Sequence, residues 1–102
     1  MPSITNAGNT FIPCLQAIVA KGYTVTHYFL GDEPDDWENP QWDADKDGQH
    51  YNATSLPELL GLIANWEVRG DDWQIKSGES ELFHQLVDAA PTYDNDGNAV
   101  HT

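Results

Sequence analysis

The stretch WDADKDGQHYNATS places acidic side chains at a spacing that could bind a calcium ion. Asp43, Asp45 and Asp47, followed by Gly48, match the opening positions of an EF-hand loop, in which alternating carboxylates surround the ion. A loop that starts at Asp43 needs a bidentate acid at its twelfth position, and that position holds Thr54. We therefore expect no dedicated calcium site in this stretch, and only weak, incidental binding of divalent ions.

The same stretch also has the pattern of a β-hairpin. Its two arms, QWDAD and QHYNA, alternate apolar and polar residues with period two, which is typical of half-buried strands. Lys46, Asp47 and Gly48 fit a three-residue hairpin loop with the glycine in the left-handed position. Because EF-hand loops are flanked by helices, the alternating flanks favour the hairpin.

A second acidic stretch, GDEPDDWENP, surrounds one tryptophan with carboxylates, and its prolines predict a loop. Negative charge around an aromatic ring is one way to build an anchor for a basic partner, because charge steers the encounter and the ring fills a pocket. For Trp37 two interpretations stay open, an exposed anchor and a lid that folds back onto the core.

The motif GDDW repeats this chemistry before Trp73, although there we expect the ring to pack onto the core. We predict a partner-binding surface formed mainly by the first of these acidic stretches. Its candidate residues are Asp32, Glu33, Asp35, Asp36, Trp37, Glu38, Asp71 and Asp72.

The other residues that carry chemistry show no catalytic or metal-ligand spacing. The four histidines form no close pair of the HxH or HxxxH kind that zinc sites use, and His50 near Asp47 is typical of surface neighbours. The single cysteine, Cys14, lies in the apolar run FIPCLQAIVA and indicates a packed thiol. The sequence contains no Gly-x-Ser-x-Gly elbow and no glycine-rich phosphate loop. We therefore predict a protein without catalytic activity, metal or cofactor.

Charge is the strongest global feature, with 17 acidic residues against 4 basic ones and a formal net charge of −13. Such a surface repels nucleic acid and anionic membranes, and it attracts basic proteins or cations. The alternative interpretation is that the charge serves solubility alone. A single cysteine fits a reducing compartment, and the opening residues MPSITNAGNT do not resemble a signal peptide. We therefore expect a cytoplasmic protein.

The order of predicted elements indicates an α+β fold. Helical periodicity predicts three helices, over residues 9–22, 55–70 and 77–90. The alternation in YTVTHYFL predicts a strand over residues 23–30 that pairs with the hairpin arms. Because consecutive strands pair most simply as neighbours, we expect a three-stranded antiparallel meander with three helices packed mainly on one face. We expect a single domain over residues 1–102, with 1–9 and 92–102 loosely ordered.

The second and third helices have the clearest apolar stripes. Ser55 and Glu58 predict a capping box at the start of the second helix. Leu62 and Ala64 widen its stripe, so we expect this helix to be covered on more than one side. The predicted stripe residues are Leu56, Leu59, Leu60, Ile63 and Trp66 in the second helix, and Leu82, Phe83, Leu86, Val87 and Ala90 in the third.

Two blocks of the chain, KGYTVTHYF at residues 21–29 and SLPELLGLIANWEVRGDDW at residues 55–73, resemble a set of small bacterial proteins, mostly uncharacterised. Several of these proteins are immunity-like, meaning small antidotes to a neighbouring toxin. The matching positions are mainly core and helix-end residues. The resemblance therefore implies a similar fold and transfers no functional residue.

The charge and the acidic tryptophan loop together predict a non-catalytic module that masks a basic surface of a partner protein. The concrete version is an immunity or antitoxin-like inhibitor of a nuclease toxin, because a nuclease needs a basic cleft to hold its substrate. The alternative is a small structural or accessory subunit that forms a homodimer through an exposed edge of its sheet.

Overall fold

The computed structural model describes residues 3–4, 8–35 and 37–100. The chain divides into two compact units, Met1–Asp71 and Asp72–Thr102. The α+β class is confirmed, because the structure contains three helices and a three-stranded antiparallel sheet. The two units are described in turn.

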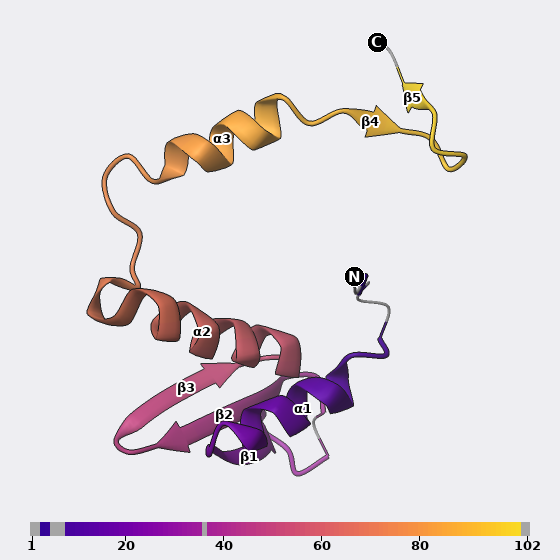
Figure 1. Ribbon diagram of the computed structural model, residues 1–102. Helices are drawn as coiled ribbons and strands as arrows, with labels where there is room; N and C mark the ends of the chain where they lie inside the picture. Colours follow the sequence, from indigo (N-terminus) through magenta and orange to yellow (C-terminus); the bar gives the residue numbers. More distant parts are fainter. Residues whose placement is uncertain (1–2, 5–7, 36, 101–102) are drawn as a thin grey trace. The chain divides into compact units, whose positions relative to one another are not determined.

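The first unit is built on a meander of three strands in the order β1-β2-β3 (Figure 1). The strands are β1 (Thr24–Phe29), β2 (Pro40–Lys46) and β3 (Gln49–Ala53), and both pairings are antiparallel. The hairpin interpretation of residues 42–53 is therefore confirmed. Asp43 and Asp45 lie within β2, so the EF-hand interpretation is wrong.

The hairpin turn is one residue shorter than predicted, because Lys46 pairs with Gln49 and only Asp47 and Gly48 join the strands. Both turn residues have positive φ, 50° for Asp47 and 83° for Gly48, as a type I′ turn requires. Asp-Gly suits that turn because aspartate tolerates the left-handed region and glycine has no side-chain penalty there. The register that follows places Asp45 opposite His50.

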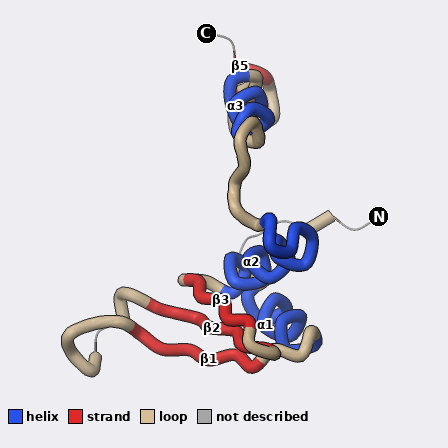
Figure 2. Tube along the Cα trace, turned by 90° about the vertical axis from the view of Figure 1, so that its left-hand side faces the viewer, coloured by secondary structure: helices blue, strands red, loops and turns tan. Residues whose placement is uncertain are grey.

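Helices α1 (Phe11–Ala20) and α2 (Leu56–Arg69) lie on the same side of the sheet (Figure 2). Ser55 is the N-cap of α2, and its side chain accepts a hydrogen bond of 3.3 Å from the backbone N–H of Glu58. Gly22, with φ of 94°, allows the chain to turn from α1 into β1. These two helices bury the inner face of the sheet.

The core of the first unit is small and lies between the two helices and the sheet. Ile18, Leu59 and Ile63 are fully buried there. Half-buried side chains, among them Cys14 and Trp42, pack around the core. The other buried hydrophobic residues are Tyr23, Ala44, Ala53 and Leu56.

The two residues expected to widen the buried stripe of α2 are exposed, and the expectation that the helix is covered on more than one side stays a prediction. Leu62 is 40% exposed and Ala64 is also exposed. Within the first unit α2 contacts α1, β2 and β3, and the residues that it buries are Leu56, Leu59 and Ile63. An apolar residue beside a stripe therefore need not be buried.

The second unit contains α3 (Ser80–Asp88) and a short hairpin of β4 (Thr92–Tyr93) and β5 (Ala99–Val100). Helix α3 is shorter than predicted, because residues 77–79 form a turn in which the Glu79 carboxylate accepts a hydrogen bond from the backbone N–H of Lys76. Residues 92–100, part of the tail expected to be loosely ordered, form the hairpin, in which backbone N–H groups donate hydrogen bonds to the Asp94 carboxylate. Among the described residues, no helix is long and apolar enough to cross a membrane.

Candidate functional site

The acidic loop between β1 and β2, residues 31–38, extends beyond the strand ends of the first unit (Figure 2). Its base is closed by a backbone hydrogen bond of 3.0 Å from Leu30 N–H to the carbonyl of Asn39. Trp37 is 69% exposed, so its indole is available to solvent rather than packed as a lid. The loop therefore presents a large aromatic side chain at one end of the sheet.

The carboxylates beside Trp37 are also exposed. Asp32, Glu33 and Asp35 lie in the loop with exposed side chains, and Glu38 is exposed as well. Asp36, which the sequence also assigned to the site, lies outside the described residues. The loop sequence contains no basic residue, so its negative charge has no cation of its own within residues 31–38.

The second predicted acidic group follows α2 in the chain. Asp71 and Asp72 follow α2 in a single 3₁₀ turn, η1 (Gly70–Asp72), and Asp72 forms an ion pair of 3.0 Å with Lys76. Asp72 belongs to the second unit, whereas the loop belongs to the first. Trp73 is 48% exposed, and the expectation that it packs onto the core stays a prediction.

The outer face of the sheet, opposite α1 and α2, carries a row of polar side chains that starts at the loop. Gln41 is buried, with 7% exposure, and its amide donates a 3.0 Å hydrogen bond to the Asn39 side chain. The Asn52 amide donates to Gln41 Oε1 at 3.0 Å and to Asp43 Oδ1 at 2.7 Å. We call Tyr28, Asn39, Gln41, Asp43, Asp45, His50 and Asn52 the polar ladder. It fixes the base of the loop to the centre of the sheet.

Asp43 is the central carboxylate of the polar ladder, with 15% of its side chain exposed. It accepts a hydrogen bond of 3.3 Å from the Tyr28 hydroxyl. Partial burial, followed by the charge and hydrogen bond of Asp43, raises the pKa of Tyr28 above its ordinary value. The Tyr28 hydroxyl therefore remains a hydrogen-bond donor to Asp43 at neutral pH.

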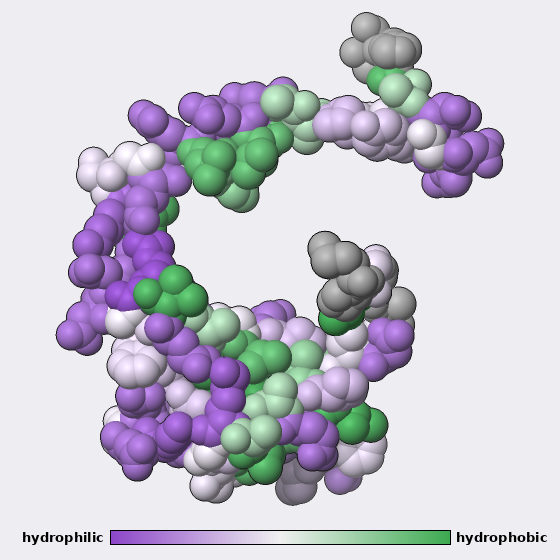
Figure 3. Space-filling model, in the orientation of Figure 1, coloured by the Kyte–Doolittle hydropathy of each residue, from purple (hydrophilic) through white to green (hydrophobic). Residues whose placement is uncertain are grey.

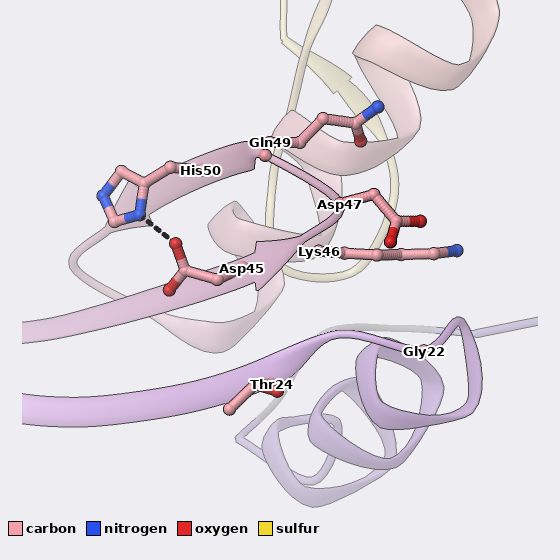
Figure 4. A pocket seen from close by; sticks show the side chains of 8 residues that line it. Gly22, Thr24, Asp45, Lys46, Asp47, Gln49 and His50 are labelled. Carbon is pink, nitrogen blue, oxygen red and sulfur yellow. Dashed lines mark hydrogen bonds and ion pairs between the residues drawn. The ribbon is translucent and has the colours of Figure 1, made fainter.

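His50 lies at the far end of the polar ladder, between two carboxylates. Its Nδ1 is 2.6 Å from Asp45 Oδ1, and its Nε2 is 3.9 Å from Asp43 Oδ2. The hydrogen bond to Asp45 raises the pKa of His50, desolvation opposes the shift, and the charges of Asp45 and Asp43 add to it. His50 and Asp45 line a shallow pocket of about 430 Å³ beside the hairpin turn (Figure 4).

Replacing Asp45 with asparagine is expected to lower the pKa of His50, because the largest cause of its elevation is the hydrogen bond to Asp45. The raised folded-state pKa means that this contact stabilises the fold fully below the unfolded pKa of about 6.5. That contribution to stability is lost as the pH rises through the folded-state pKa of His50. An NMR titration of the His50 ring protons measures the shift directly.

Asp47→Asn is the matched control for this titration, because Asp47 is the neighbouring hairpin acid and asparagine also tolerates its positive φ. The pKa of His50 should be nearly unchanged in this control. An equal fall of the pKa in both variants would show that general charge, and not the Asp45 contact, sets it.

Stacked rings lie on the inner face of the sheet, at the end that carries the loop of residues 31–38. The His27 ring lies over Trp42 with centroids 3.8 Å apart and an interplanar angle of 12°. Phe29 meets His27 edge-on at 4.8 Å. The His27 Nδ1 is 2.8 Å from the carbonyl of Gln41. These contacts pack the strand ends beside the loop, and a well-packed base reduces the entropy that an anchor loses on binding.

The first unit's cations lie away from the loop, at the hairpin and on the helices. Lys21 forms an ion pair of 2.9 Å with Glu67. Lys46 donates to the Lys21 carbonyl at 2.7 Å and lies over the Tyr23 ring. These positive charges are thus engaged elsewhere, and the loop and the polar ladder form a negative surface.

This arrangement is suited to binding a cationic surface. Within the described ranges, no group of three or more histidine, cysteine or acidic side chains has the geometry of a metal site. The weak divalent-ion binding expected at Asp43, Asp45 and Asp47 stays a prediction, as does the expectation that the protein has no catalytic activity.

Sequence reasoning missed the polar ladder. It treated His50 as a neighbour of Asp47, whereas the ring contacts Asp45. The signal was available, because period-two alternation puts Asp43 and Asp45 on one face of β2 and His50 and Asn52 on one face of β3. A two-residue Asp-Gly turn then sets the register in which Asp45 faces His50 and Asp43 faces Asn52. The predicted three-residue loop shifted the register and hid the pairing.

Comparison with protein-family models, with curated proteins and with solved structures finds no match to this chain. The class that the fold and the site define is therefore an α+β protein with an acidic, tryptophan-bearing loop at one end of its sheet. The resemblance of residues 21–29 and 55–73 to immunity-like proteins stays a prediction.

Proposed function

We propose that this protein is a non-catalytic binding module that masks a basic surface of a partner protein through the loop at residues 31–38. The observation that carries the proposal is the exposure of Trp37, at 69%, among the exposed carboxylates of Asp32, Glu33 and Asp35. Tryptophan is enriched among the residues that dominate binding energy, so a large exposed indole among carboxylates is a candidate anchor for a partner.

The charge of the chain supports the same function. A net charge of −13 accelerates encounter with a basic partner, and it disfavours nucleic acid and anionic membranes as ligands. A nuclease toxin is the concrete partner that we propose, because its substrate cleft must be basic. In that version the protein acts in the cytoplasm as an immunity or antitoxin-like inhibitor.

Affinity capture from the native host tests the proposal. The wild-type protein, as bait at low salt, should recover a basic protein, and most of it should be released at about 0.5 M salt, where the Debye length falls to a few ångströms. A bait with Asp32→Asn, Glu33→Gln and Asp35→Asn should recover much less, because it has lost the charges around Trp37.

The matched control bait carries Asp47→Asn, Asp88→Asn and Asp96→Asn, which remove three exposed charges outside the loop. This control should recover nearly as much partner as the wild type. An equal loss of recovered partner with both triple variants would mean that the net charge alone, and not the loop, attracts the basic partner. Recovery of no basic protein by the wild type would refute the proposed function.

A further inference from the structure

Gln41 is the one buried polar side chain in the part of the chain that the structure describes. It lies on the outer, polar face of the sheet, and Figure 3 shows hydrophobic side chains gathered on the opposite side of the first unit, over α1 and α2. Gln41 is only 7% exposed, whereas Tyr28 and Asn52 on the same face are exposed. A carboxamide withdrawn from water to this degree costs free energy unless the protein supplies its hydrogen bonds.

The carboxamide of Gln41 is satisfied at both ends. Its Nε2 donates a hydrogen bond of 3.0 Å to Asn39 Oδ1, and its Oε1 accepts one of 3.0 Å from Asn52 Nδ2. The Asn52 amide also donates to Asp43 Oδ1 at 2.7 Å. An apolar side chain of similar size could fill this position, but it could form neither of the two bonds of Gln41. What glutamine adds here is therefore a link from β3, through its amide, to Asn39.

Asn39 is the residue at which the loop returns to the sheet, directly before β2. Its carbonyl accepts the 3.0 Å hydrogen bond from the N–H of Leu30, the residue at which the chain leaves β1. Gln41 therefore holds the side chain of the residue whose backbone closes the loop. The backbone of Gln41 contributes as well, because its carbonyl lies 2.8 Å from His27 Nδ1. All of these contacts join residues of the first unit.

We infer that Gln41 is the positioning residue of the loop at residues 31–38: its buried amide fixes both ends of the loop through Asn39 and thereby sets where Trp37 is presented. Because Gln41 is buried, it acts through Asn39 rather than by contact with a partner. An anchor that is held in place before binding loses less entropy in the complex. That benefit rests on the proposed function, whereas the positioning itself is measurable in the free protein.

Gln41→Met tests the inference, because methionine is unbranched like glutamine and its sulfur is only a weak hydrogen-bond acceptor. In amide hydrogen exchange of the full chain, the protection of the Leu30 N–H should fall about tenfold, since the loop closure has lost a supporting hydrogen bond. The amide of Ala44, a fully buried residue in the middle of β2, reports on unfolding of the whole unit. Its protection should fall clearly less than that of Leu30.

Asn39→Ala removes the acceptor of the same hydrogen bond from an exposed residue, and it should lower the protection of Leu30 by a similar factor. The double variant with Gln41→Met should lower it little further, because the two substitutions break one shared contact. Thr26→Val is the matched control, since it makes an exposed polar residue of the same sheet face apolar and leaves the loop contacts intact. It should leave the protection of Leu30 within about twofold of the wild type.

The presentation of Trp37 has a readout of its own, the heteronuclear NOE of its indole N–H. This NOE should fall in Gln41→Met and in Asn39→Ala, because loosened loop ends give the ring more freedom on the picosecond-to-nanosecond timescale. It should be unchanged in Thr26→Val. A purely structural role of Gln41 would lower the stability of the first unit without changing the motion of this ring.

Equal falls in protection at Leu30 and Ala44 would overturn the inference, because they would show that Gln41 stabilises the whole unit and not the loop in particular. An unchanged NOE of the Trp37 indole, or additive effects of the two single substitutions, would overturn it as well. These results are independent of the partner. The local effect of Gln41→Met without any recoverable basic partner would keep the positioning residue and refute the proposed function, and loss of the partner with Trp37→Ala alone would do the reverse.

Discussion

Replacing Ile63 with alanine is expected to destabilise the first unit by about 2–5 kcal/mol, the range found for truncation of large aliphatic core residues. Ile63 is fully buried between α2, α1 and the sheet, and it is one of three large side chains with no exposure. The lost carbons take apolar contacts with them, and the surrounding side chains can close the cavity only in part. In a core this small, such a loss is a large share of the total stability.

Urea unfolding, followed by tryptophan fluorescence, measures this effect, because the half-buried Trp42 and Trp66 lie in the first unit. Val68→Ala on the same helix is the matched control. Val68 is 86% exposed, and alanine is the better helix former, so the free energy of unfolding should change by less than about 0.5 kcal/mol. Equal destabilisation by the two substitutions would contradict the proposed position of the core.

Removing the indole of Trp37 is expected to weaken the proposed complex by about 2–4 kcal/mol, or roughly 30- to 1000-fold in affinity. The side chain is already exposed, so its loss should leave the stability of the free protein nearly unchanged. Most of the effect should appear as faster dissociation, because truncating a packed anchor removes contacts that form only in the complex.

Trp73→Ala is the matched control, since it removes the same side chain from a second acidic motif, GDDW. Trp73 is 48% exposed and lies outside the loop, so its loss should change the affinity less than about threefold. Comparable losses from both substitutions would mean that exposed indoles contribute without regard to position, and the loop would have no special role.

The fold of the first unit was largely predictable, because its signals are local and agree with one another. Ser55 before an apolar stripe, glycine after α1 and the alternation around Asp47-Gly48 each specify one element. The error in the turn had a physical cause: two-residue and three-residue loops both accept glycine in the left-handed region, and only Asp47 at positive φ separates them.

Whether the side chains of α3 and Trp73 are buried or exposed could not be predicted from periodicity. A stripe such as Leu82, Phe83, Leu86 and Val87 shows that a helix has an apolar face, and it contains no information on what covers that face. Exposure of Trp37 was open for the same reason. The polar ladder depended on strand register, and the register depended on a turn whose length was predicted one residue too long.

The most direct test of the central claim is the affinity of the captured basic partner for the wild type and for Trp37→Ala, measured by surface plasmon resonance at 0.15 M salt. The account predicts that the dissociation constant rises at least about 30-fold on loss of the indole. A change of less than about threefold, in a variant that unfolds at the same urea concentration as the wild type, would contradict the claim that Trp37 anchors the partner.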